Sequence, residues 1–287
     1  MLDRELRIGY LPITDATAVL LGHELGLFAQ YGVPSARPVL FRSWEALAQA
    51  FTVGEVDLVH LLMPFAVQLR FGRSVPARVL GWGHANGSAL TVRRGITRME
   101  HLAGGTVAIP YWWSVHNVLL QRMLAAAGLQ VGLRGNAATT AATAGAGWSR
   151  SGLVNLVVMP PAEMASALAA GQIDGFVVAD PFSAVAEANG SGTVLRFLGD
   201  VWRSHGCCAV VVRDDLIARA PRVVQGITDA VVDAQRWAQT HREDVTGHLT
   251  GATGAGVSAA EARGHPAGAH SNSQSGRPDS SAPRLAR

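Results

Sequence analysis

The sequence contains no lysine and only two cysteines, which are neighbours at positions 207 and 208. Adjacent cysteines can form a disulfide only through a strained ring, so a disulfide framework is excluded. No apolar run approaches the roughly 18 residues of a membrane span. All 24 basic residues are arginines, and only Arg93 and Arg94 are adjacent. Because no basic stripe follows from this scatter, we predict no nucleic-acid partner.

The recurrent catalytic motifs are also missing. The sequence has no G-x-S-x-G elbow, no phosphate-binding P-loop, no H-E-x-x-H, no C-x-x-C and no G-x-G-x-x-G after a strand. We therefore predict that the protein is not an enzyme and needs no cofactor. Its histidines and cysteines lie far apart without metal-type spacing, so we predict no metal site.

What the sequence does have is enough apolar residues for one large core or two medium ones, with 48% hydrophobic and 16% charged residues in 287. Strand-like runs alternate with helix-spaced segments, which indicates an α/β fold with mainly parallel sheets. The predicted strands are 6–11, 39–41, 58–62, 79–82, 89–92, 106–109, 153–158, a strand after 171 that ends at 180, and 208–212. The predicted helices are 16–28, 44–51, 65–71, 115–127, 162–170 and 221–242.

This alternation restarts after Asn86-Gly87, and the long helix after Pro221 can return the chain to where it began. We therefore expect two lobes, residues 1–88 with 215–250 and residues 89–214. The second lobe would carry a surface insertion at 134–152, which is rich in Gly, Ala, Thr and Ser.

The last 37 residues, 251–287, contain 24 Gly, Ala, Ser and Pro. Such a segment cannot bury enough apolar area to offset its chain entropy, so we predict a disordered tail. A truncated or frame-shifted end of the gene is an alternative explanation.

Polar and aromatic side chains follow the ends of the predicted strands, where open α/β sheets bind ligands. The candidate ligand-binding residues are Thr14, Asp15, Trp44, His60, His84, Asn86, Gly87, Trp113, Ser114, His116, Asn117, Asp180, His205 and Cys207. Several have a purely structural alternative: a packed aromatic for Trp44, a hydrogen-bonded core histidine for His60, a turn at Asn86-Gly87, a helix cap for Ser114 and a small buried hydrophobe for Cys207.

Taken together, segments in order over residues 6–245 resemble the nitrate/sulfonate/taurine class of ABC-transporter solute-binding proteins, and its nitrate and bicarbonate branch in particular. The resemblance rests on residues 7–15, 26–28, 31–33, 43–44, 54–64, 86–91, 109–110, 114–117, 171–176 and 180–182. It implies a two-lobed periplasmic-binding-protein type II fold that closes on a small anion and delivers it to an ABC permease and ATPase. It implies contact with the membrane only through the permease.

Carried over by position, the resemblance places a tryptophan contact at Trp44, a turn contact at His84 and Asn86, helix-start contacts at 114–117 and a backbone contact near 179–180. The branch's cationic lysine would fall near 205–208, where this chain has His-Gly-Cys-Cys. We expect imidazolium groups of His60, His84, His116 and His205 to supply the missing charge at mildly acidic pH. A neutral or zwitterionic ligand is the alternative.

The family implies a location in the periplasm or on the outer face of the membrane. Residues 1–7 do not resemble a signal peptide, and no lipid-anchor cysteine is present in the chain as given, so a cytoplasmic location is expected if Met1 is the native start. A cytoplasmic anion sensor that acts through a protein partner is therefore a second hypothesis. A third, suggested by the cysteine pair, is an enzyme like the thiamine-pyrimidine synthases of the same superfamily.

Overall fold

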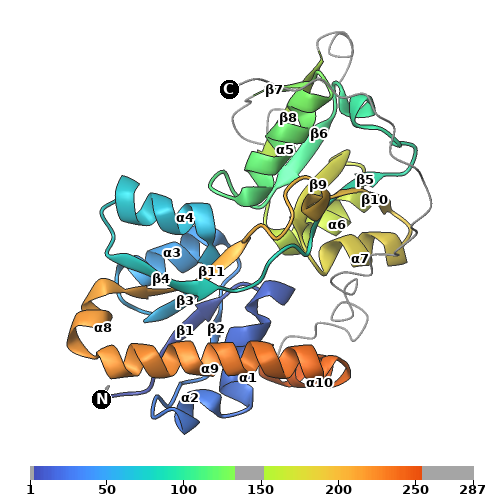
Figure 1. Ribbon diagram of the computed structural model, residues 1–287. Coiled ribbons are helices and arrows are strands. Elements are labelled where there is room, and N and C mark those ends of the chain that lie inside the picture. Colours follow the sequence, from blue (N-terminus) through green and yellow to red (C-terminus); the bar gives the residue numbers. More distant parts are fainter. Residues whose placement is uncertain (1–2, 133–151, 254–287) are drawn as a thin grey trace, which may run out of the picture.

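The computed structural model describes residues 3–132 and 152–253. Their strands form two separate sheets, one of five strands and one of six (Figure 1). Helices flank both sheets, so each lobe is a layered α/β unit. The predicted insertion at 134–152 and most of the predicted tail lie outside the described residues, apart from Gly152 and residues 251–253, which end the last helix.

The first sheet has the strand order β2-β1-β3-β11-β4. Its strands are β1 (Ile8–Tyr10), β2 (Val39–Leu40), β3 (Leu58–Leu62), β4 (Ala77–Trp82) and β11 (Cys208–Arg213). β1 pairs in parallel with β2 and β3, whereas β11 pairs antiparallel with β3 and β4. β3 is buried at every position, which explains why its residues are apolar except for His60.

The second sheet has the order β10-β5-β9-β6-β8-β7. Its strands are β5 (Ser88–Arg93), β6 (Thr106–Ile109), β7 (Gln130–Gly132), β8 (Leu153–Val158), β9 (Gly175–Ala179) and β10 (Gly192–Phe197). β6, β7, β8 and β9 pair in parallel, and β5 joins them antiparallel to β9 and β10. Both sheets are therefore mixed, with the antiparallel strands next to the points where the chain changes sheet.

The helices of the first lobe are α1 (Thr17–Glu24), α2 (Leu27–Gln30), α3 (Trp44–Thr52), α4 (Met63–Val67), α8 (Asp214–Arg219), α9 (Pro221–Thr240) and α10 (Arg242–Thr253). Those of the second are α5 (Val115–Ala126), α6 (Pro161–Ala169) and α7 (Phe182–Ala188). Short helical turns lie at Thr14–Ala16, Gln68–Gly72, Met99–Leu102 and Leu198–Asp200. Among the described residues, no helix is both long and apolar enough to cross a bilayer.

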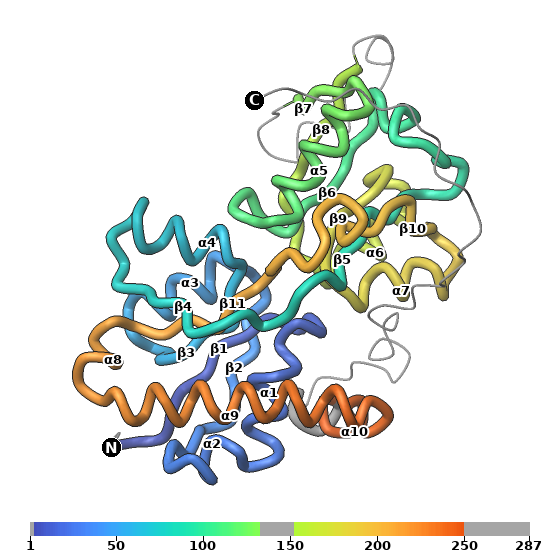
Figure 2. Tube along the Cα trace, viewed as in Figure 1, coloured from blue at the N-terminus to red at the C-terminus, as the bar shows by residue number. Residues whose placement is uncertain are grey.

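The chain passes between the lobes twice, in the segment between β4 and β5 and in the segment that leads into β11 (Figure 2). The predicted lobe boundary at residue 215 is therefore wrong for Cys208–Arg213, which belong to the first sheet. The sequence pattern could not show this, because β11 pairs antiparallel with strands about 150 residues earlier, and such non-local pairing leaves no local signal.

Two apolar clusters hold the lobes together. The smaller lies within the first lobe, where α1 and α9 pack over the sheet and bury residues such as Leu21, Phe28 and Ile227. The larger is continuous from the first lobe, with Trp44 and Leu61, into the second, with Phe176. The lobes are therefore packed against each other in a closed arrangement.

Candidate functional site

The two crossing segments run side by side between the lobes. Ala85 and Gly206 form an isolated antiparallel bridge, and the amide of Gly83 donates to the carbonyl of Cys208 at 2.8 Å. Asn86 and Gly87 both have positive φ, at 64° and 67°, a turn conformation that asparagine and glycine tolerate best. The turn interpretation of Asn86-Gly87 is thus correct, and the turn lies where the chain enters the second lobe.

Hydrogen bonds between the lobes fix the closed arrangement. The Thr14 hydroxyl donates to the carbonyl of Asp180 at 2.9 Å, and the Thr14 amide donates to the same oxygen at 3.1 Å. Within the second lobe, the amide of Asp180 donates to the carbonyl of Gly87 at 3.0 Å, which extends the pairing of β5 with β9. At the far edge, the Tyr111 hydroxyl donates to Glu45. Thr14 and Asp180 therefore meet, as two of the predicted site residues from opposite lobes.

A buried polar cluster lies beside these contacts. Its first half is formed by Asp15, which is 3% exposed, and His84, whose Nδ1 lies 3.1 Å from Asp15 Oδ2. His84 Nε2 lies 2.5 Å from the carbonyl oxygen of Asn86. Neither carboxylate oxygen of Asp15 has a well-aligned hydrogen-bond donor among the described residues.

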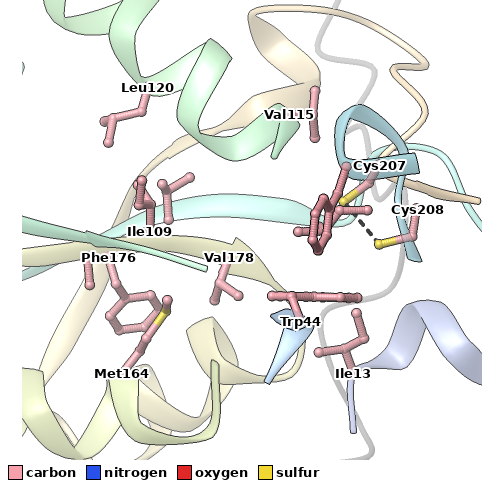
Figure 3. Packing of buried hydrophobic residues seen from close by; sticks show 14 of the residues in the cluster. Ile13, Trp44, Ile109, Val115, Leu120, Met164, Phe176, Val178, Cys207 and Cys208 are labelled. Atoms are coloured by element: carbon pink, nitrogen blue, oxygen red, sulfur yellow. Dashed lines mark hydrogen bonds between the residues drawn. The ribbon is translucent and has the colours of Figure 1, made fainter. Parts of the chain in front are cut away.

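The second half of the cluster joins α5 to β11. His116 Nε2 lies 3.0 Å from the hydroxyl of Ser88 and 3.6 Å from the thiol of Cys207. The sulfurs of Cys207 and Cys208 are 3.8 Å apart (Figure 3). All four side chains are buried.

His60 is fully buried in the middle of β3, yet neither of its ring nitrogens has a hydrogen-bond partner among the described residues. A Cβ added at Gly83 would lie 2.5 Å from His60 Nε2, so glycine is required for this close approach. The described residues therefore supply none of the hydrogen bonds that the core-histidine alternative for His60 requires, and its nitrogens remain available to a bound group.

Burial disfavours the charged forms of several groups in this cluster. It lowers the pKa of His60 and of His116 to about 3, and it lowers the pKa of His205, opposed by a bond to the Trp202 carbonyl. It also raises the pKa of Asp15 and of both cysteine thiols. The expectation that His60, His116 and His205 become imidazolium at mildly acidic pH is therefore wrong, because the charged form would lose its hydration.

The predicted helix start is formed as expected but is partly occupied by its own contacts. Ser114 Oγ accepts from the amide of Asn117 at 3.1 Å and donates to the Tyr111 carbonyl at 2.7 Å. The Asn117 side chain donates to the Trp112 carbonyl and accepts from Gln121. Asn117 therefore stabilises the loop before α5, and Trp113, at 45% exposed, lies outside the buried cluster.

Trp44 begins α3 and is 2% exposed. It packs in the continuous core beside Ile13 of the first lobe and Val178 of the second, across from Cys207 (Figure 3). Its indole Nε1 is buried and has no hydrogen-bond partner among the described residues. Trp44 thus combines the predicted packing with an unused donor at the boundary between the lobes.

Several predicted residues come together and others do not. Asp15, His60, His84, His116 and Cys207 share one cluster, to which sequence reasoning failed to add Ser88 and Cys208. His205 bonds the Trp202 carbonyl at 2.8 Å and, like Asn86, stabilises the crossing. Ser88 could have been found as the first residue of a strand that follows a predicted site turn.

Two sheets joined by two crossings, closed over a buried polar cluster, define the two-lobed class of periplasmic binding proteins. The chain belongs to the NMT1-like family, whose model matches residues 2–247. It resembles the structure of the periplasmic nitrate-binding protein NrtA from Synechocystis, with a TM-score of 0.74 and 20% identity over 86% of this chain and 65% of that one. It also resembles the alkanesulfonate-binding protein SsuA of Xanthomonas axonopodis, with a TM-score of 0.70 and 19% identity over 90% and 82%.

Curated relatives include the nitrate/nitrite binding protein NrtA of Nostoc, 24% identical over 80% of this chain. Another is the nitrate import ATP-binding protein NrtC of Synechocystis, 24% identical over 85% of this chain. The chain spans 53% of the first relative and 37% of the second. These relatives are solute-binding and import proteins, which supports a binding role.

Proposed function

We propose that this protein binds a small oxyanion, of the nitrate, bicarbonate or sulfonate type, between its lobes. The observation that supports this most directly is the buried, unpartnered Nε1 of Trp44 at the lobe boundary. An indole N–H can only donate a hydrogen bond, and a buried donor without a partner costs about 1–3 kcal/mol. An acceptor ligand in the cleft removes that cost.

His116 offers a second neutral donor. If the Ser88 hydroxyl donates to His116 Nε2, the neutral ring carries its own hydrogen on Nδ1, a buried atom without a partner among the described residues. His116 also lies in the first turn of α5, where backbone N–H groups have no partner within the helix. Aligned neutral donors of this kind can compensate an oxyanion for its lost hydration without a lysine.

We further propose that the protein delivers its solute to an ABC permease and ATPase. The similarity to a nitrate import ATP-binding protein supports this partner class, because that relative contains a region like the present chain. The membrane would then be contacted only through the permease.

The test is a thermal-shift screen of the purified full chain against nitrate, nitrite, bicarbonate, taurine and alkanesulfonates. A ligand that binds only the folded state at a hundred times its Kd stabilises it by about 2.7 kcal/mol, which raises the Tm measurably. We expect one class of oxyanion to raise the Tm with saturation, while chloride at equal ionic strength does not. Equal responses to all salts would contradict the proposal.

A further inference from the structure

The buried cluster around Asp15 contains donor atoms without hydrogen-bond partners among the described residues, and anion binding does not account for them. Asp15, His84 and Cys207 each offer one ligand atom, and these atoms all lie within 4.8 Å of one another. Asp15, His60 and Cys208 do the same. We propose that this cluster, centred on Asp15, is a binding site for a thiophilic divalent metal ion such as Zn²⁺.

The spacing of the donor atoms fits such an ion. Zn–S bonds of about 2.3 Å in a tetrahedron place two sulfurs about 3.8 Å apart, and Zn–N and Zn–O bonds of about 2.0 Å place nitrogen and oxygen about 3.3 Å apart. The sulfurs of Cys207 and Cys208 are 3.8 Å apart, and His84 Nδ1 lies 3.1 Å from Asp15 Oδ2. Small shifts of side chains therefore suffice to form the site.

The cluster also lacks an internal explanation. Asp15 is 3% exposed and His60 is 0% exposed, and Asp15 Oδ1 and both His60 ring nitrogens have no hydrogen-bond partner among the described residues. A buried carboxylate beside unpartnered imidazoles is costly, whereas a cation at their centre would accept one lone pair from the carboxylate and one from each imidazole that binds it. No arginine supplies this positive charge, since no guanidinium contacts Asp15 among the described ion pairs.

The donor types select the metal. Thiolate and imidazole favour Zn²⁺ and related ions, whereas Mg²⁺ and Ca²⁺ require oxygen ligands. On binding, each coordinating thiol releases one proton, and Asp15 is held as the carboxylate. The ligands come from the first lobe and from the two crossing segments, so the ion would tie the crossings to β1 and β3.

This inference goes beyond the proposed function and does not rest on it, because the metal is measured with no oxyanion added. The experiment uses tag-free full chain, purified after denaturation with chelator and refolding with or without one equivalent of Zn²⁺ or Co²⁺. We expect about one ion per chain by elemental analysis after dialysis. With Co²⁺ we expect an intense sulfur-to-cobalt charge-transfer band, and with Zn²⁺ we expect protection of both thiols from alkylation.

Conservative variants separate a site from a fold defect. Asp15→Asn and the double variant Cys207→Ser with Cys208→Ser are each expected to weaken Zn²⁺ binding at least about tenfold, the loss typical of removing even an outer-shell partner. Comparing His60→Ala with His84→Ala assigns the imidazole ligand. Asp200→Asn and His101→Ala, both exposed, are the matched controls and should bind as the wild type does.

If the double cysteine variant does not fold, the cobalt spectrum and the thiol protection of the wild type still show whether the metal binds through the cysteines. Folded wild type that retains no more metal than a denatured sample, with thiols equally reactive in both conditions, would overturn the proposal. So would equal affinity in the wild type and Asp15→Asn. A negative result for metal binding leaves the thermal-shift result with oxyanions unaffected. A negative thermal-shift result likewise leaves the metal-binding result unaffected.

Discussion

Two buried aspartates of the first lobe have opposite environments. Asp57, just before β3, accepts from Arg4 at 2.6 and 2.7 Å, from Arg7 and from the Arg7 amide. Asp15, which follows β1 in the chain, has the His84 ring at 3.1 Å and two thiols nearby, and no arginine pairs with it among the described ion pairs. These partners hold the pKa of Asp57 at about 2, against an opposing effect of burial, while burial raises that of Asp15.

The comparison separates a carboxylate with a structural role from one for which we propose a binding role. Asp57 is satisfied within the lobe and fixes the chain before β1 to the chain before β3. Asp15 is left short of partners at the place where both crossings and both lobes meet. A folded chain keeps such an arrangement when something else completes it.

The largest expected effect on stability comes from removing the carboxylate of Asp57, which has its hydrogen-bond partners within the lobe. Asp57→Asn should lower the free energy of unfolding by about 2–3 kcal/mol at pH 7, because charge-assisted hydrogen bonds to two arginines are lost. Denaturant unfolding followed by circular dichroism measures this. Asp229→Asn, at a partly exposed position of α9 where the Gln225 side chain is its only donor among the described residues, is the control and should stay within about 0.5 kcal/mol. A loss no larger than that control would contradict the structural role.

A slightly smaller effect on the free energy of unfolding is expected when the pH is lowered. Since the folded pKa of Asp57 is lowered from 3.8 to about 2, its contribution is complete above the unfolded value and is lost as pH falls through the folded one. We expect about 2 kcal/mol to disappear between about pH 5 and pH 2. Asp57→Asn should flatten this part of the stability curve, and an unchanged curve in that variant would assign the acid sensitivity elsewhere.

The smallest expected effect on the free energy of unfolding is that of Asp15→Asn, and its sign is opposite to that of Asp57→Asn. In metal-free protein, Asp15→Asn should raise the free energy of unfolding slightly at pH 7, because burial raises the folded pKa of Asp15 and its ionisation therefore costs stability as pH rises. Adding Zn²⁺ should reverse the order, with stabilisation of the wild type only. If Asp15→Asn destabilises the metal-free protein as Asp57→Asn does, the two aspartates do not differ in the way described.

Much of the fold could be predicted from local signals. The bounds of β3, β6 and β8 agree with the predicted strands, and Ser114 caps its helix as expected, because these features depend on neighbouring residues. The sequence did not reveal α7, β10 or the break between α9 and α10, where apolar periodicity is weak.

The site was predictable only in part. The rule that ligands lie past strand ends selected Asp15 and His84, which are neighbours in the fold. It also selected His116, but the positive charge predicted for that ring was wrong, since burial lowers its pKa. Metal-type spacing was absent because Asp15, His60 and Cys208 lie on three different segments of the first lobe. The parallel pairing of β1 with β3 and the antiparallel pairing of β11 with β3 bring these segments together.

The central claim is that neutral donors, led by the Trp44 indole, hold an oxyanion between the lobes. The direct measurement is calorimetric titration of the best oxyanion into wild type, Trp44→Phe and Trp237→Phe, the last being a tryptophan of α9 that stacks on His241. Losing one hydrogen bond to a charged acceptor costs about 1.5–3 kcal/mol, so Trp44→Phe should bind about tenfold to a hundredfold more weakly. Trp237→Phe should bind as the wild type does. Equal affinities in Trp44→Phe and the wild type, with both folded, would contradict the claim.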